Sequence, residues 1–295
     1  MELGYLGNLS RKLATSNLSL NQIRPEIVQP TASQRNRPFP QFSNVQLLAP
    51  SFGVSNYHAG VVKMEKRFSR GFNILTTYTW AKFLDNADSS GGSLGDEGNA
   101  FSNLYDRRPD YGPSENDIHH RFTLSSVWQL PFGRRKAFLQ SGLPAKLAGG
   151  WSIGVVALLQ SGPPITVATQ TNTTFAYSSG PQRADVLRNP NLPASDRSVQ
   201  RWFDTSAFAQ PATNMFGNQG VGLVRAGGVM NLNTSLIRAF RIEERYTLQF
   251  RAESFNVANH PNFGIPGRVF EGPGFGVVAS ARPARQLQFG MRLVF

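Results

Sequence analysis

The chain has 295 residues, no cysteine and a net charge of +12, so it has room for one large domain or two ordinary ones but cannot form a disulfide or a cysteine metal site. Apolar residues make up 40% and charged residues only 16%, a composition poor in both core aliphatics and surface charge. The 24 arginines and 6 lysines are scattered instead of forming a stripe, which argues against nucleic-acid binding. No run of eighteen apolar residues exists, which excludes helical membrane spans but not membrane strands.

The first third of the chain predicts a weak strand, a long loop and a clear hairpin. Residues 2–9 can form a short strand, and the loop that follows is rich in Asn, Gln, Pro and Arg and holds a brief strand at 44–48. Tyr57–Phe68 and Phe72–Lys82 then alternate apolar and polar residues and are joined by three residues that end in Gly71. This spacing predicts an antiparallel hairpin.

The middle of the chain predicts two further strands between long loops. A loop over 85–116 leads to a strand over Arg121–Leu130, and a shorter basic connector leads to a strand over Trp151–Gln160. The longest loop then runs from 162 to about 230. In both strands the apolar residues fall at every second position, so each strand is expected to have one apolar and one polar face.

The last third predicts a second hairpin and a closing strand. Leu232–Phe240 and Tyr246–Val257 flank a tight turn, and a loop rich in Gly and Pro leads to a strand over Arg285–Phe295. One face of the closing strand carries Leu287, Phe289, Met291, Leu293 and Phe295, and the other carries Gln286, Gln288, Gly290, Arg292 and Val294. The closing strand therefore has one fully apolar face.

Two-faced strands of this kind are typical of a membrane β-barrel, in which the apolar face meets lipid, the polar face meets the lumen and about ten tilted residues cross the hydrocarbon. The connections alternate between long and short along the chain, as expected where extracellular loops are long and periplasmic turns are short. The alternative is a soluble sandwich, such as a sugar-binding one, which would have to bury the apolar face of the closing strand against a second sheet.

Short motifs occur along nearly the whole chain. They are Lys63-Met64-Glu65-Lys66-Arg67-Phe68, Tyr78-Thr79-Trp80-Ala81-Lys82, His120-Arg121-Phe122, Leu130-Pro131-Phe132-Gly133, Gly149-Gly150-Trp151, Ser161-Gly162-Pro163-Pro164, Phe250-Arg251-Ala252-Glu253 and Asn259-His260-Pro261-Asn262-Phe263-Gly264. In their order and spacing they resemble the C-terminal barrel region of TonB-dependent outer-membrane receptors, in particular the Oar-like group of Acidobacteria-type genomes.

The resemblance implies a barrel of 22 strands that encloses an N-terminal plug and takes up a large or scarce solute with energy relayed by TonB. Residues 1–295, with about eight strands and no signal peptide, plug or TonB box, are expected to be a C-terminal fragment of it: an all-β, antiparallel transmembrane β-barrel portion with long extracellular loops. The alternative is a self-contained small outer-membrane barrel, or a surface adhesion protein without transport. In this class the terminal aromatic residue, here Phe295, serves as an assembly signal.

A few side chains are candidates for contact with a solute. Arg121, Arg251, Glu253 and Arg292 are expected to face the lumen, where charges tune which solutes pass, unless they only pair with one another or with a plug. In the longest loop, Trp202 and Phe203 are candidate substrate contacts.

No catalytic or metal-binding constellation stands out. His119 and His120 point to opposite faces of an extended segment, so a strand start is preferred to a metal site. The acidic residues Asp85, Asp88, Asp96, Glu97 and Asp106 crowd one loop without calcium-loop spacing, so solvated charge is preferred there. We therefore expect no enzymatic activity and no cofactor. The expected partners are outer-membrane lipid, the barrel-assembly machinery through the closing strand, and TonB through the N-terminal part that this chain lacks.

Overall fold

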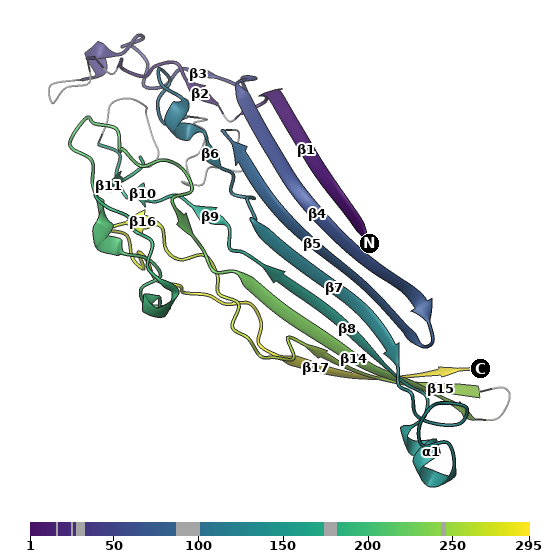
Figure 1. Cartoon of the computed structure of the whole chain (residues 1–295). Coiled ribbons are helices and arrows are strands. Elements are labelled where there is room, and N and C mark those ends of the chain that lie inside the picture. Colours follow the sequence, from purple (N-terminus) through teal and green to yellow (C-terminus); the bar gives the residue numbers. More distant parts are fainter. Residues whose placement is uncertain (16, 25, 28–32, 87–100, 174–181, 243–245) are drawn as a thin grey trace.

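The computed structural model describes residues 1–295 except 16, 25, 28–32, 87–100, 174–181 and 243–245, and its main feature is one antiparallel sheet (Figure 1). Eight long strands follow one another across the sheet in chain order: β1 (Glu2–Leu13), β4 (Gly53–Ser69), β5 (Phe72–Asp85), β7 (His120–Gln129), β8 (Trp151–Gln160), β14 (Val229–Ile242), β15 (Tyr246–Phe255) and β17 (Gln286–Val294). A short strand, β6 (Gly112–Pro113), pairs with the end of β5. Among the described helices, none is long and apolar enough to cross a membrane.

The strand register brings one apolar residue after another to the same face of the sheet, although a few apolar residues, such as Leu75, Ile237 and Val294, lie on the other face. One row of directly paired residues crosses six strands and is apolar throughout: Leu3, Val62, Tyr78, Phe122, Leu159 and Met230. A second row crosses the last five strands: Trp128, Ile153, Leu236, Ala252 and Phe289. Because directly paired residues lie on the same side of a sheet, the predicted alternation is confirmed strand by strand.

Apart from the connector that contacts Trp151 and Arg238, no other described part of the chain is seen to cover the exposed part of this apolar face. In β17 the side chains of Phe289 and Met291 are 69% and 75% exposed, and Trp80 of β5 is 64% exposed. An apolar surface this wide is not stable against water, so the sheet requires an apolar environment on that side. The sequence indicated an apolar face for single strands, and the structure shows that these faces join into one apolar face of the whole sheet.

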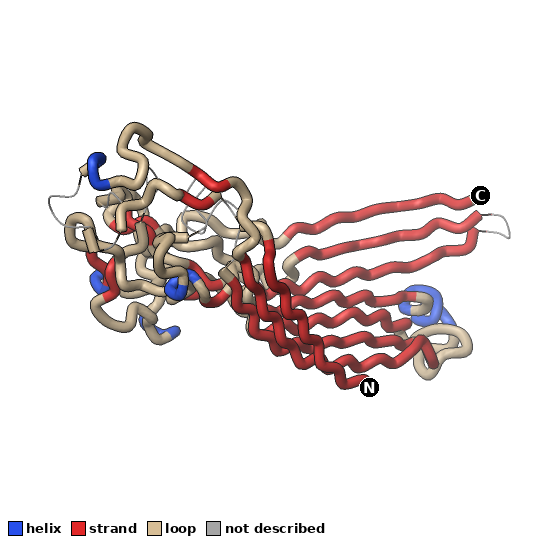
Figure 2. Tube along the Cα trace, turned by 90° about the horizontal axis from the view of Figure 1, so that it is seen from above, coloured by secondary structure: helices blue, strands red, loops and turns tan. Residues whose placement is uncertain are grey.

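The two ends of the sheet differ sharply (Figures 1 and 2). At one end lie the C-terminus, the turn at Arg70 and Gly71, both with positive φ, and a short helix, α1 (Gly142–Ala148). The N-terminus lies short of this end, where Glu2 pairs with Lys63. We call this the turn end. The connector over 131–149 was expected to be a plain loop, and α1 is an addition that its sequence did not indicate.

At the other end the four long loops fold against one another into a cap. Its short elements are β2 (Leu18–Ser19), η1 (Gln34–Asn36), β3 (Gln46–Leu47), η2 (Arg108–Asp110), β9 (Pro164–Ile165), β10 (Ala168–Thr169), β11 (Asp185–Val186), η3 (Ala194–Asp196), η4 (Thr205–Ala207), β12 (Phe208–Ala209), β13 (Val224–Arg225) and β16 (Val269–Phe270). The short strands form four two-stranded pairs: β2 with β3, β9 with β13 and β11 with β12 each lie within one loop, and β10 with β16 joins the longest loop to the loop before β17.

Several strands are longer than predicted, β1, β4, β5 and β14 among them, and the sheet remains open. β1 continues to Leu13 because Ser10 and Arg11 still pair with Ser55 and Val54 of β4, which itself begins at Gly53. Among the described strands β1 pairs with β4 alone and β17 with β15 alone, so the sheet is not closed into a barrel. A barrel of 22 strands therefore stays a prediction.

Phe289 tests whether lipid covers the apolar face. Phe289→Arg places a charge at the middle of β17 on that face, and we expect it to destabilise the membrane-inserted protein by about 2–4 kcal/mol. Gln288→Arg, one residue earlier on the polar face, is the matched control and should change stability by less than about 0.5 kcal/mol. Urea unfolding in lipid vesicles measures both variants. Equal costs would contradict the assignment of the two faces.

Candidate functional site

The cap has its own hydrophobic core, built from residues of the longest loop and of the loop before β17. Phe203 is fully buried at its centre, and its ring packs edge to face against Phe208 and Phe275 with centroid distances of 5.7 and 5.3 Å. The other buried core members are Ile165, Val167, Ala184, Ala207, Val224 and Ala226. Such edge-to-face contacts add to the burial of apolar area, so the cap is a folded unit and not a set of separate loops.

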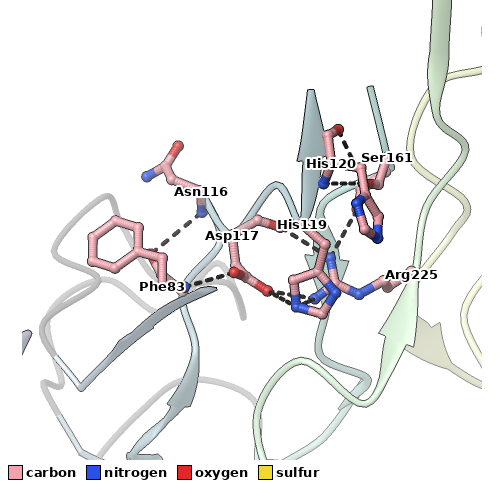
Figure 3. Close-up of polar contacts among 9 residues, drawn as sticks. Phe83, Asn116, Asp117, His119, His120, Ser161 and Arg225 are labelled. Carbon is pink, nitrogen blue, oxygen red and sulfur yellow. Dashed lines mark hydrogen bonds and ion pairs between the residues drawn. The ribbon is translucent and has the colours of Figure 1, made fainter. Parts of the chain in front are cut away.

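A buried ion pair joins the cap to the strand ends (Figure 3). The carboxylate of Asp117, whose side chain is 1% exposed, lies against the guanidinium of Arg225 from β13. Its Oδ1 also accepts a hydrogen bond of 2.7 Å from the backbone N–H of Phe83 in β5. Arg225 Nη1 donates to the carbonyl oxygens of Asp117 and Gly162 at 2.9 and 3.1 Å. A buried carboxylate with this set of donors is fully compensated, and it holds three separate segments together.

His119 completes the cluster. Its Nε2 lies 2.8 Å from Asp117 Oδ2 and 2.9 Å from Arg225 Nη2. That nitrogen carries either a proton, which it donates to the carboxylate, or a lone pair, which accepts from the guanidinium. Burial lowers the pKa of His119, the charge of Arg225 lowers it further, and the charge of Asp117 opposes both. His120, the first residue of β7, points to the apolar face instead, where its Nδ1 lies 2.8 Å from the hydroxyl oxygen of Tyr78.

A second buried ion pair links the same two loops. Arg183, with a side chain 3% exposed, lies 3.0 Å from the carboxylate of Asp110. Its Nη1 donates to the carbonyl oxygen of Pro109 at 2.7 Å, and its Nη2 donates to Ser102 Oγ at 2.5 Å. Burial raises the pKa of Asp110, and the guanidinium of Arg183 opposes that rise. The loop before β7 and the longest loop are thus fastened to each other at two points.

A cleft of about 480 Å³ opens beside the first ion pair, where the cap meets the sheet. Its walls come from the loop before β7, the ends of β8 and β14 and the loop before β17, and they include Glu115, Gln160, Phe263, Ser280 and Arg282. Gln160 is paired with Arg121 and lies on the polar face of the sheet. Val229, another wall residue, is paired with Gln160, so the cleft is on the polar side of the sheet. Its wall combines apolar side chains with amide, hydroxyl and both kinds of charged group.

The backbone around the cleft is held by close contacts that explain two of the sequence motifs. A Cβ on Gly162 would collide with the carbonyl of Ala226, so Ser161-Gly162-Pro163-Pro164 needs glycine at its second position. Asn262 is 3% exposed, and its amide accepts from the N–H of Met230 at 2.7 Å and donates to the same residue's carbonyl at 3.0 Å. The loop before β17 is thereby attached to the start of β14.

The four charged residues predicted to face the lumen share one face of the sheet. By the register, Arg121, Arg251, Glu253 and Arg292 all lie opposite to the apolar face. Arg251 Nη1 lies 3.6 Å from Glu253 Oε1, so these two interact with each other. That this face lines a lumen stays a prediction. Phe295, the predicted assembly signal, is 90% exposed beyond the end of β17.

The predicted loop contacts lie in different surroundings. Phe203 belongs to the buried core, so its ring is not accessible to a solute in this structure. Trp202 is partly buried, donates from Nε1 to the carbonyl of Arg225 at 2.9 Å and packs edge to face on Phe263 of the cleft wall. Both contact roles stay predictions, and Trp202 reaches the cleft only indirectly, through its contact with Phe263.

Sequence reasoning missed Asp117 and Arg225, which are 108 residues apart. The sequence held one signal for Asp117, which is its place two residues before His119 and His120 at the start of a strand. Among the described residues, no group of His, Asp and Glu could hold a metal ion. The acidic loop residues Asp88, Asp96 and Glu97 lie outside the described residues.

Comparison with known proteins assigns the chain to a family. A family model described as an outer membrane beta barrel domain matches residues 1–288, and the chain belongs to this family. The protein is accordingly located in the bacterial outer membrane, which supplies the apolar environment that the sheet requires. Neither the search of curated proteins nor the search of solved structures found a match.

Arg225 tests the role of the ion pair. Arg225→Met leaves the Asp117 carboxylate buried without its cation, and we expect the cap to lose about 3–5 kcal/mol of local stability. Arg201→Met, which breaks the exposed ion pair with Asp204 in the same loop, is the control and should cost less than about 1 kcal/mol.

Native-state hydrogen exchange separates the cap from the sheet in this test. The amide of Ala226 should lose protection in Arg225→Met, while that of Val155 in β8 should not. Unchanged protection of Ala226, or an equal loss at both amides, would show that the pair does not hold the cap.

Proposed function

We propose that this chain is the C-terminal barrel segment of a TonB-dependent outer-membrane transporter, of the Oar-like group, for uptake of a large or scarce solute. The motifs that resemble this group extend over nearly the whole chain. The observation that carries the proposal is the folded cap with a cleft of about 480 Å³, lined by both apolar and polar residues, on the polar side of the sheet. In the proposed orientation the cap is extracellular and the turn end is periplasmic, because long loops lie outside in such barrels.

The unpaired edge strands and the long polar-face side chains favour a wide barrel over a small one. In hydrocarbon the unpaired backbone groups along β1 and β17 must find partners, since each unsatisfied group costs several kcal/mol. A closed barrel of about eight strands has an interior that side chains fill. The long polar-face side chains of Arg121, Arg251 and Arg292 and a cleft above them fit a wider, water-filled lumen. We therefore propose that β1 and β17 pair with further strands of a 22-strand barrel.

No catalytic role forms part of this proposal. Asp117, Arg225, Asp110 and Arg183 are engaged in ion pairs that hold loops together, and among the described residues of the cleft wall no nucleophile has an adjacent base. Phe295 is proposed to be read by the barrel-assembly machinery, which its exposure beyond β17 allows. Contact with TonB would be made by parts of the transporter outside residues 1–295.

Binding to TonB tests the transport function. The full-length gene product, isolated from outer membranes, should bind the purified periplasmic domain of TonB saturably in a surface-binding assay. An unrelated outer-membrane porin prepared in the same way is the control and should not bind. Absence of saturable binding would contradict the proposal and favour adhesion through the cap.

Engineered disulfides test the barrel width on the same protein, because the chain has no native cysteine. Glu253→Cys with Gln288→Cys, which face each other across β15 and β17, should cross-link and serves as the positive control. Asn8→Cys combined in turn with Gln286→Cys, Gln288→Cys or Gly290→Cys should not cross-link, because β1 and β17 are not neighbours in a wide barrel. Efficient cross-linking of one of these pairs would show a closed small barrel.

A further inference from the structure

The connector between β7 and β8 is fastened to the apolar side of the sheet. Trp151 Nε1 donates to the carbonyl of Leu147 at 3.0 Å, and Arg238 Nη1 donates to the same oxygen at 2.5 Å. Arg238 Nη2 also donates to the carbonyl of Lys146. Trp151 and Arg238 are directly paired and belong to the apolar face. The carbonyl end of α1 is therefore held on the side of the sheet that meets lipid, at the turn end (Figure 1).

The connector presents large apolar side chains that nothing in the described chain covers. Leu143 and Leu147 of α1 are 72% and 71% exposed, and Phe138 and Leu139 just before it are 59% and 47% exposed. A surface segment in water does not normally gather four such residues.

The same connector is basic throughout. It carries Arg134, Arg135, Lys136 and Lys146 and contains no Asp or Glu between residues 130 and 150, a net charge of +4. Basic groups beside exposed Leu and Phe are the composition of segments that lie in a membrane interface and bind anionic headgroups.

The depth of the connector matches that interface. Trp151 packs edge to face on Phe250 at 6.0 Å, and the guanidinium of Arg238 lies 4.2 Å from the ring centre of Phe240. Aromatic rings near the ends of membrane strands mark the level of the headgroups. The ring of Trp151 thus lies at headgroup level and donates directly to α1.

We propose that residues 132–148 form a binding surface for anionic phospholipid in the periplasmic leaflet. Phe138, Leu143 and Leu147 enter the boundary between headgroups and acyl chains, and the basic side chains bind the lipid phosphates. The proposal rests on the orientation given under the proposed function, with the turn end in the periplasm. Through this surface the connector attaches the turn end of β7 and β8 to the periplasmic leaflet.

Residues 1–295 contain no cysteine, so an introduced cysteine is the only one in this part of the protein and can be labelled. Leu143→Cys, labelled with an environment-sensitive fluorophore in the full-length protein from outer membranes, is placed in nanodiscs of phosphatidylcholine or of phosphatidylcholine with phosphatidylglycerol. Leu187→Cys in the cap, where the native side chain is 63% exposed, is the matched control. Brominated phosphatidylglycerol is the quencher.

The expected result is a blue-shifted emission at position 143 that brominated phosphatidylglycerol quenches, with neither effect at position 187. The triple variant Arg134→Gln, Arg135→Gln and Lys136→Gln should weaken the apparent affinity for phosphatidylglycerol by about tenfold or more. Equal, water-like emission at both positions would overturn the proposal, and so would quenching that the triple variant leaves unchanged, because the charges would then play no part. TonB binding by the same preparations shows separately whether the proposed function holds.

Discussion

The fold depends on one constraint, which is that an antiparallel sheet with a continuous apolar face must place that face in lipid and pair every backbone group there. The paired row from Leu3 to Met230 shows how strictly the register obeys it, since a slip of one residue in any strand would move polar side chains into the hydrocarbon. The chain therefore needs little hydrophobic core beneath the sheet, which accounts for the low aliphatic content.

The cap must be stabilised by contacts of its own, because lipid does not cover its loops. Its small phenylalanine core around Phe203 is supplemented by two buried ion pairs, Asp117 with Arg225 and Asp110 with Arg183. Both pairs connect the loop before β7 to the longest loop. They therefore fix these two loops relative to each other beside the cleft. Removing one partner of such a buried pair leaves an uncompensated buried charge, so both partners are needed for the loops to keep this arrangement.

Alternation predicted seven of the eight long strands to within a few residues, because a strand with one apolar and one polar face places apolar residues at every second position. The closing strand, Trp151–Gln160 and the hairpin around Gly71 are examples. β1 shows little alternation and was expected only as a weak strand over residues 2–9. The cap could not be predicted, since Asp117 and Arg225 are brought together by long-range loop packing that leaves no local period. Phe203 illustrates the same limit, because an aromatic residue in a polar loop is equally consistent with a ligand contact and with a loop core.

The most direct measurement of the central claim is a cysteine scan along β17, from Leu287 to Leu293, in the native outer membrane. A membrane-impermeant thiol reagent should label positions 288, 290 and 292, which face water, and leave 287, 289 and 291 unlabelled because lipid covers them. A labelling pattern with a period of two residues is the result that this account predicts. Uniform labelling along the strand would contradict it, because the apolar face would then not be in lipid.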